Sequence, residues 1–303
     1  MRSTTAVLAL TWTLAMPALA HAATVSTLAT GLTEVSALAF GPGGALYALQ
    51  RSPGGAIVKI APNGTVTPFV SGLDDVVQMV FDSSGNLFVS DYGQNKVLKI
   101  TPGGIVSTFA TISEPHGIVI DPSDNLYVNE YSNQTLDKIT PTGIVSVVAT
   151  NVGPADQRAT SLARDVSGDL YVGTLYGSVI TRVTTVGAKS TFATGTGGDA
   201  GMTMGPDGNW YVSSYASGTS VSNMILRVSP TGTVSVAAGT GAYGSLDGPA
   251  LSATFAWPWG VAFGPDEKLY VADNNTGRVR IIDFGFVTPV RSSTWGHLKS
   301  LYR

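Results

Sequence analysis

The residues of this chain that could move a proton lie in one short stretch, "EPHGIVIDPSDNLYVNEY" at 114–131. It holds His116, the one histidine between residues 26 and 293, and Glu130, fourteen positions further on. An imidazole with its ordinary pKa of about 6.5 exchanges protons readily at neutral pH. A neighbouring carboxylate would stabilise the protonated ring and raise that pKa. The pair therefore fits a general acid and base, and the alternative is two polar residues at strand ends.

Whether the two side chains meet depends on the strands that carry them. An apolar segment after His116 leads into the turn "DPSD" at 121–124 and the run "NLYVN" at 125–129. This pattern predicts an antiparallel hairpin, in which positions equally distant from the turn lie opposite one another. We therefore expect His116 and Glu130 to lie within hydrogen-bond reach, directly or through one water molecule, with Glu130 raising the pKa of His116.

The same hairpin recurs along the chain. Six runs resemble "LYV", and their central aromatic residues are Tyr47, Phe88, Tyr127, Tyr171, Tyr211 and Tyr270. The intervals are 41, 39, 44, 40 and 59 residues, the last lengthened by an insert around 240–256. Turns such as "PGG" and "PTG" then lead to a fourth short strand. Four strands per ~40 residues predict an all-β fold, a six-bladed β-propeller with four-stranded antiparallel blades. A β-sandwich would lack this fixed period, and a β-helix has shorter rungs.

The segment Thr24–Ala29 predicts how the ring closes. The sequence at 24–40 copies that at 105–120, which runs from a fourth strand into a first strand. We expect this N-terminal strand to complete the sixth blade, because an open ring would leave strand edges exposed. The alternative is "FVTPV" at 286–290. The propeller is predicted to span 23–290, and the tail at 291–303 fits no repeat.

The first 22 residues are typical of a secretory leader. Arg2 precedes an apolar run, Pro17 ends it, and Ala20-His21-Ala22 is a small-x-small cleavage pattern. Cleavage after Ala22 predicts a periplasmic or secreted protein that has no membrane segment once the leader is removed. The chain has no cysteine, 12% charged residues and a formal net charge of −3. This balance argues against nucleic acid as a partner, and we expect a monomer.

The propeller geometry predicts three rings of residues on the top face, near the axis. The first, just before strand one, holds Glu34, Asp75, Glu114, Arg158, Gly198 and Trp257. Two positions further on lie Ser36, Val77, His116, Thr160, Ala200 and Trp259. The third, at the end of strand two, holds Gln50, Asp91, Glu130, Thr174, Ser214 and Asp273. From these rings the predicted ligand-binding residues are Glu34, Asp75, Glu114, Arg158, Trp257 and Trp259.

Some of these residues also have a structural interpretation. Asp91 and Asp273 could accept hydrogen bonds from neighbouring backbone N–H groups. Trp257 and Trp259 could form a hydrophobic plug for the insert rather than an aromatic wall for a ligand. Arg158 could pair with a carboxylate at the rim, a contact of little energetic value.

The last blade carries a family resemblance. "WPWGVAFGPDEKLYVADNNTGRVRIID" at 257–283 resembles an NHL repeat, and the insert before it is similar to the linker between bacterial NHL repeats. The chain also resembles two groups of enzymes. The blade "PHGIVIDPSDNLYVNEYSNQTLDKITPTG" at 115–143 is similar to those of the streptogramin B (virginiamycin B) lyases. The second group comprises the gluconolactonases and regucalcin, which are metal-dependent lactone hydrolases.

The two resemblances imply different chemistry. The lyases imply His116 and Glu130 as the acid/base pair, but Val77 stands where a second histidine is expected, and Tyr127-Val128 replaces Trp-Phe. The lactonases imply a divalent ion, Ca²⁺ or Mg²⁺, held by oxygen ligands. The residues predicted to supply those ligands are Glu34, Asp91 and Asp273.

The resulting hypothesis is an exported propeller that binds a small molecule or a peptide at the centre of its top face. The alternative is a lyase or lactone hydrolase. An enzyme should have a deep polar pocket around His116 and Glu130. A binding platform should have a broad, shallow face with Trp257 and Trp259 exposed.

Overall fold

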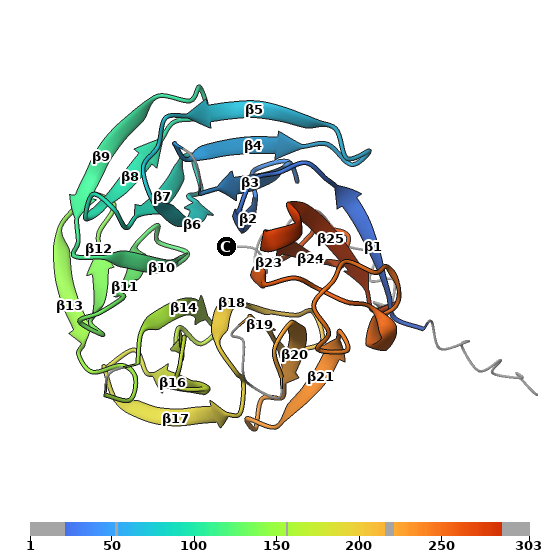
Figure 1. The fold of residues 1–303 in the computed structure, drawn as a ribbon. Helices are drawn as coiled ribbons and strands as arrows, with labels where there is room; N and C mark the ends of the chain where they lie inside the picture. Colours follow the sequence, from blue (N-terminus) through green and yellow to red (C-terminus); the bar gives the residue numbers. More distant parts are fainter. Residues whose placement is uncertain (1–21, 52–53, 156, 216–220, 287–303) are drawn as a thin grey trace, which may run out of the picture.

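The computed structural model describes residues 22–51, 54–155, 157–215 and 221–286. Six antiparallel sheets surround a central axis (Figure 1), so the prediction of an all-β six-bladed propeller is confirmed. Within the described residues the only helices are two short 3₁₀ turns, and no helix has the length and apolar composition to cross a bilayer. The predicted leader, apart from Ala22, and the predicted tail lie outside the described residues.

The blades follow the predicted repeat in order, from the axis outward. Blade one has β2 (Val35–Phe40), β3 (Leu46–Gln50), β4 (Ala56–Ile60) and β5 (Val66–Ser71). Blade two has β6 (Val76–Phe81), β7 (Leu87–Asp91), β8 (Lys96–Ile100) and β9 (Val106–Thr111). Blade three has β10 (Pro115–Ile120), β11 (Leu126–Glu130), β12 (Leu136–Ile139) and β13 (Val145–Ala149).

The second half of the ring repeats this order. Blade four has β14 (Ala159–Arg164), β15 (Leu170–Thr174), β16 (Val179–Val183) and β17 (Lys189–Thr194). Blade five has β18 (Asp199–Met204), β19 (Trp210–Ser214), β20 (Met224–Val228) and β21 (Val234–Ala238). Blade six has β23 (Pro258–Phe263), β24 (Leu269–Asp273), β25 (Arg278–Asp283) and β1 (Thr24–Ala29). The insert adds β22 (Gly248–Pro249) outside β1 and the turn η1 (Ala250–Ser252), and η2 (Asn274–Thr276) follows β24.

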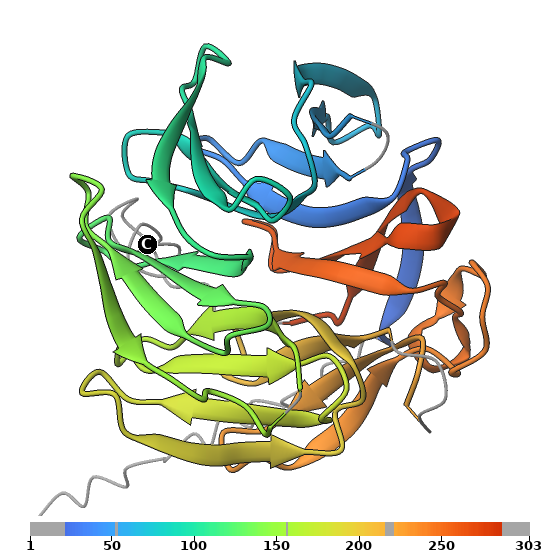
Figure 2. The ribbon, with the colours of Figure 1, turned by 60° about the vertical axis from the view of Figure 1, so that its left-hand side comes forward.

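The hydrophobic core lies between neighbouring blades rather than inside each one. One cluster joins Ala37 and Leu49 of blade one to Val76 and Leu87 of blade two. Each blade is twisted, so its inner and outer strands run at an angle to each other (Figure 2). The inner strands of neighbouring blades lie close together. A Cβ atom on Gly201 would lie 2.5 Å from the carbonyl oxygen of Trp259, which excludes larger residues at that point.

The N-terminal strand occupies the place predicted for it. β1 pairs antiparallel with β25, from Thr24 opposite Asp283 to Ala29 opposite Val279. Blade six therefore combines three strands from the C-terminal part of the chain with one from the N-terminal part. Of the alternative segment at 286–290, only residue 286 is described. The position of the fourth strand is already filled by β1.

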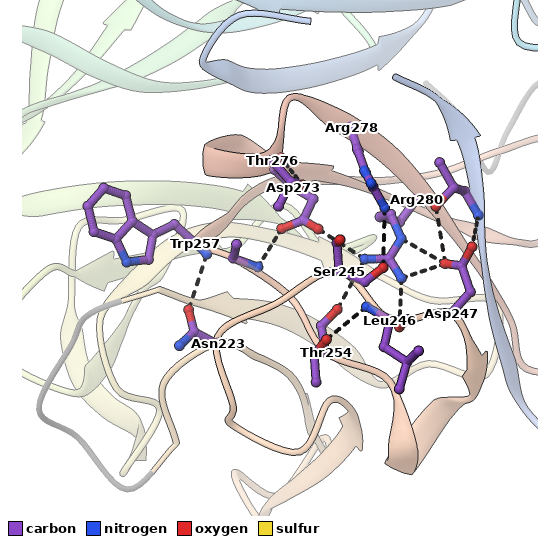
Figure 3. Close-up of polar contacts among 12 residues, drawn as sticks. Asn223, Ser245, Leu246, Asp247, Thr254, Trp257, Asp273, Thr276, Arg278 and Arg280 are labelled. Carbon is purple, nitrogen blue, oxygen red and sulfur yellow. Dashed lines mark hydrogen bonds and ion pairs between the residues drawn. The ribbon is translucent and has the colours of Figure 1, made fainter. Parts of the chain in front are cut away.

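A buried arginine holds this junction together (Figure 3). Arg280 on β25 is fully buried and donates to Asp273 at 3.0 Å and, through Nε, to Asp247 at 3.0 Å. Its remaining donors reach the carbonyl oxygens of Leu246 at 2.9 Å and Thr254 at 3.1 Å in the insert. One guanidinium thus connects the blade to the insert, and one of the insert residues that it binds also holds the N-terminal strand.

That last residue is Asp247, which accepts hydrogen bonds from the backbone N–H and the hydroxyl of Thr27 on β1, at 3.0 and 3.2 Å. Asp273 has its other oxygen 2.6 Å from the backbone nitrogen of Ala256. Burial raises the pKa of Asp273, while Ala256 and Arg280 oppose that rise. Asp273 therefore has a structural role, as an acceptor for the Ala256 backbone N–H and for Arg280.

Candidate functional site

Six equivalent backbone hydrogen bonds shape the top of the channel. In each blade, the residue just after strand two donates its N–H to the carbonyl of the residue just before strand one. The pairs are Arg51 to Glu34, Tyr92 to Asp75, Tyr131 to Glu114, Leu175 to Arg158, Tyr215 to Gly198 and Asn274 to Trp257, with distances of 2.8–3.2 Å. This repeated bond places the residue after strand two at the mouth of the channel.

A pocket of about 250 Å³ lies at this mouth. Its lining residues are Arg51, Tyr92, His116, Tyr131, Thr160, Leu175, Tyr176, Tyr215 and Trp259. His116, Thr160 and Trp259 come from the second predicted ring. Most of the others come from the position directly after the third predicted ring. Side chains alternate along a strand, so the last residue of strand two points away from the pocket and the residue after it points in.

His116 is buried and its tautomer is determined by the neighbouring blade. Its Nδ1 lies 2.7 Å from the carbonyl oxygen of Thr160 on β14. A carbonyl can only accept, so Nδ1 carries the proton and Nε2 is left as an acceptor. The ring stacks on Tyr131 with centroids 5.1 Å apart. Burial, opposed by the Thr160 carbonyl and assisted by the charge of Arg51, lowers the pKa of His116 to about 4. The imidazole is therefore neutral at neutral pH.

Glu130 does not partner His116, and the prediction that it raises the pKa of that residue is wrong. Glu130 lies opposite Pro115 in the hairpin, where a bulge follows Pro115, and it accepts from Asn133 Nδ2 at 3.0 Å. Its charge contributes, after burial, to raising the pKa of Asp137 to about 6. The hairpin brought the two strand ends together as expected, but the side chains diverge.

Side-chain alternation explains the divergence. Asn129 donates to the Ala159 carbonyl at 2.8 Å, which places it on the side of blade three that faces blade four, together with His116. Glu130 is the next residue along the strand and therefore points to the opposite side. The expected acid/base pair would need both side chains on one side.

Aromatic rings form most of the pocket wall. Tyr92 meets Tyr131 edge-on at 5.5 Å, and Tyr215 packs against Trp259 at 4.8 Å. The indole Nε1 of Trp259 is buried and has no hydrogen-bond partner among the described residues. Burial raises the pKa of Tyr131 and of Tyr215, and the first neighbour to add to each rise is Tyr176. The phenol groups of these tyrosines are thus close enough to influence one another.

Two arginines flank the pocket, and each covers the face of an aromatic ring. Arg51 has its Cζ 5.6 Å from the ring centroid of Trp259. Its Nε and Nη2 both donate to the same oxygen of Asp75, at 2.9 and 2.5 Å. Arg158 has its Cζ 5.0 Å from the centroid of Tyr131. Arg158 is therefore a neighbour of the pocket wall, and Arg51 is part of it.

The predicted ligand-binding residues separate into three groups. Trp259 lines the axial pocket. Glu34 and Asp75 line a second, more open pocket of about 310 Å³ beside it, which also includes Arg51 and Asp74. The others lie next to the axial pocket without lining it, and they are Glu114, Arg158 and Trp257. Trp257 is 39% exposed and has its backbone N–H bonded to Asn223 (Figure 3).

The residues predicted to bind a metal are not brought together. Asp91 is buried and accepts from the backbone N–H of Gln94 at 2.9 Å, Asp273 is paired with Arg280, and Glu34 lies at the exposed rim. Within the described ranges, no three His, Cys, Asp or Glu side chains form a group suited to a metal ion. The expected Ca²⁺ or Mg²⁺ therefore does not fit the predicted ligands.

Sequence reasoning missed the tyrosines. Tyr92, Tyr131 and Tyr215 stand directly after strand two in "DYG", "EYS" and "SYA". The recurrence of a tyrosine at one repeat position in three blades was the available signal. Arg51 occupies the same position in blade one.

Comparison with known proteins supports the fold. Residues 255–282 match the NHL repeat. No curated protein matches the chain. An auxiliary nutrient binding protein from Bacteroides thetaiotaomicron is 15% identical, with a TM-score of 0.73 over 86% of this chain and 76% of that one.

Two solved enzymes have the same architecture. A virginiamycin B lyase from Staphylococcus aureus is 18% identical, with a TM-score of 0.62 over 86% of this chain and 98% of the lyase. A gluconolactonase from Xanthomonas campestris is 13% identical, with a TM-score of 0.68 over 88% of this chain and 92% of the enzyme. At these identities the likeness concerns the fold, and the protein is a six-bladed β-propeller that carries an NHL repeat.

Proposed function

We propose that this protein binds a small molecule in the aromatic pocket at the mouth of its central channel. The observation that carries the proposal is the convergence of His116, Trp259 and four tyrosines on one cavity of about 250 Å³. Concave sites with apolar walls and a few oriented polar groups are the usual form of a ligand site. The volume suits a compact molecule better than a peptide segment. Similarity in fold to a nutrient binding protein is consistent with this role.

The pocket offers a ligand a hydrogen-bond acceptor. Nδ1 of His116 is bonded to the Thr160 carbonyl, so Nε2 can accept from a ligand. Such a hydrogen bond contributes about 0.5–1.5 kcal/mol. The predicted leader would place this site in the periplasm or outside the cell, where such a protein meets dissolved small molecules.

The test is a screen of small molecules for stabilisation of the folded protein, since a ligand that binds only the native state raises the melting temperature. Hits are then measured by calorimetry on the wild type and on His116→Ala. The matched control is Asn133→Ala, a surface change on the same blade. Ligands that stabilise the wild type and Asn133→Ala but not His116→Ala support the proposal. Equal binding to all three places the ligand elsewhere.

An enzymatic role is the second candidate, and one observation favours it. His116 is neutral and has an unprotonated Nε2 in a buried pocket, so it could accept a proton from a bound substrate. Glu130 has no part in this version, and Val77 supplies no second base. Turnover of any screened compound should be abolished by His116→Ala and retained by Glu130→Gln. Loss of turnover in Glu130→Gln would contradict this assignment.

A further inference from the structure

The residues that line the axial pocket carry charge of one sign only. Of its lining residues, Arg51 alone carries a formal charge at neutral pH, since His116 is neutral. None of the described residues that line this pocket carries a carboxylate. The nearest acidic cluster, Glu34, Asp74 and Asp75, lines the second pocket on the other side of Arg51. Arg51 is thus the wall between a cationic aromatic pocket and an acidic one.

Asp75 orients Arg51 without using all of its donors. Nε and Nη2 of Arg51 both donate to one oxygen, Oδ1 of Asp75, and within the described ranges these are the hydrogen bonds of the Arg51 side chain. A guanidinium has five N–H donors, and its planar fork can bind a carboxylate through two parallel bonds. Because Asp75 already holds the side chain in place, little rotamer freedom remains to be lost on binding.

The positive charge of Arg51 is not cancelled inside the pocket. It lowers the pKa of His116, after the larger effect of burial. It also opposes the rise in the pKa of Tyr215 that burial causes. Both directions are those expected of a positive charge beside the two rings.

The orientation of the rings argues against a cationic ligand. Aromatic cages bind cations through the negative faces of their rings. Here guanidinium groups lie over Trp259 and Tyr131, and His116 also stacks on Tyr131. The covered faces of these two rings are not available to a cationic ligand. The covered faces and the positive charge of Arg51 therefore both disfavour a cation in this pocket.

We propose that the ligand is a small carboxylate with a planar ring and a hydroxyl or N–H group. Its carboxylate lies on the free donors of Arg51, its ring contacts the tyrosines and Trp259, and its donor reaches Nε2 of His116. This inference rests on the proposed function and adds the chemical class of the ligand.

The experiment compares three probes that differ in charge and share a ring: 4-hydroxybenzoate, 4-hydroxybenzamide and 4-hydroxybenzylamine. Binding to the folded wild type is measured by calorimetry at neutral pH. A charge-assisted contact to Arg51 should make the carboxylate bind at least about tenfold more tightly than the amide. The amine should bind most weakly. Arg51→Gln should remove the preference for the carboxylate over the amide.

Arg227→Gln is the control, because it removes the same charge from an exposed position on β20, away from the pocket. It should retain the preference. Circular dichroism and melting temperature establish that both variants are folded. An amide or amine that binds as tightly as the carboxylate overturns the proposed class. So does a preference that survives in Arg51→Gln.

The experiments distinguish a wrong ligand class from a wrong binding site. If neutral compounds from the wider screen bind in a His116-dependent way while the carboxylate does not, the axial pocket is a ligand site and the proposed class is wrong. If neither the probes nor any screened compound binds, both the class and the proposed function are overturned.

Discussion

Two arginine–aspartate pairs in this protein serve different ends. Arg280 is fully buried and is surrounded by two aspartates and two carbonyl oxygens. Arg51 has a side chain that is 24% exposed, and it places both of its hydrogen bonds on one oxygen of Asp75. Both cations lie over an aromatic ring, Phe255 in the first case and Trp259 in the second. The two guanidinium groups differ in how many of their N–H donors are hydrogen-bonded within the protein.

The number of satisfied donors distinguishes a structural arginine from one that can bind a ligand. A buried charge is tolerated only where its hydrogen-bonding capacity is used, so the saturated Arg280 belongs to the closure of the ring. Unused donors beside a cavity remain available to a ligand, so Arg51 belongs to the candidate site. The contrast predicts that removing Arg280 damages stability and removing Arg51 damages binding.

The largest effect is expected for Arg280→Met. It leaves Asp273 buried beside an apolar side chain, and breaking a buried pair in this way costs about 3–5 kcal/mol of unfolding free energy. Urea unfolding followed by circular dichroism measures the change. Arg278→Met, on the same strand and partly exposed, is the control and should cost far less. Similar losses in both variants would break the comparison.

The next effect concerns the pH dependence of stability through His116. Its pKa is about 4 in the folded protein and about 6.5 when unfolded. The unfolded state therefore binds the proton more tightly, and stability falls as the pH drops from about 6.5 to about 4. The linked loss is on the order of 3 kcal/mol.

His116→Gln should be less sensitive to pH in that window. Unfolding measured between pH 4 and pH 7.5 tests the point, with Asn133→Ala as the control that retains the wild-type slope. A His116→Gln profile parallel to that of the wild type would show that the ring is not desolvated in the folded protein.

A smaller effect on stability is expected at Asp199, a buried carboxyl group that, among the described residues, has no ion pair with an arginine. Its Oδ2 accepts from the Thr196 hydroxyl at 3.0 Å. Burial raises its pKa well above the ordinary value, while the Thr196 hydroxyl and the backbone N–H of Thr174 oppose that rise. The folded state therefore binds the proton more tightly, and stability falls as the pH rises from about 4 through the raised pKa.

Asp199→Asn should remove that loss and raise the melting temperature at neutral pH by about 2–4 °C, which is roughly 1 kcal/mol for a domain of this size. Calorimetric scans at pH 5 and pH 8 should show a gain that is larger at pH 8. Asp207→Asn, in an exposed turn, is the control. A lower melting temperature at both pH values would mean that the carboxylate is satisfied in the fold.

The smallest change in stability is expected for Arg51→Gln. Its pair with Asp75 is partly exposed, and such pairs are worth about 0–1 kcal/mol. Urea unfolding should therefore place Arg51→Gln within about 1 kcal/mol of the wild type, while calorimetry shows the loss of carboxylate binding. A loss of stability approaching that of Arg280→Met would assign Arg51 to the scaffold.

The sequence by itself determined the repeat and much of the ring it forms. The recurring "LYV" runs and their turns set the number of blades, and the copied segment Thr24–Ala29 indicated the strand that pairs with β25. The sequence also indicated which strand-one positions face the channel, since His116 and Trp259 belong to the same predicted ring and both line the pocket. These features follow from local periodicity, which a single chain displays directly.

Only the tertiary structure decided which side chains meet. His116 was expected opposite Glu130, but its partner is the Thr160 carbonyl, 44 residues away on the next blade. A bulge after Pro115 and the alternation of side chains turned Glu130 to the other side. The pairing of Arg280 with Asp247 in the insert likewise depends on how distant segments pack. Contacts between blades depend on how separate sheets pack, and the spacing of residues within one repeat carries no information about that packing.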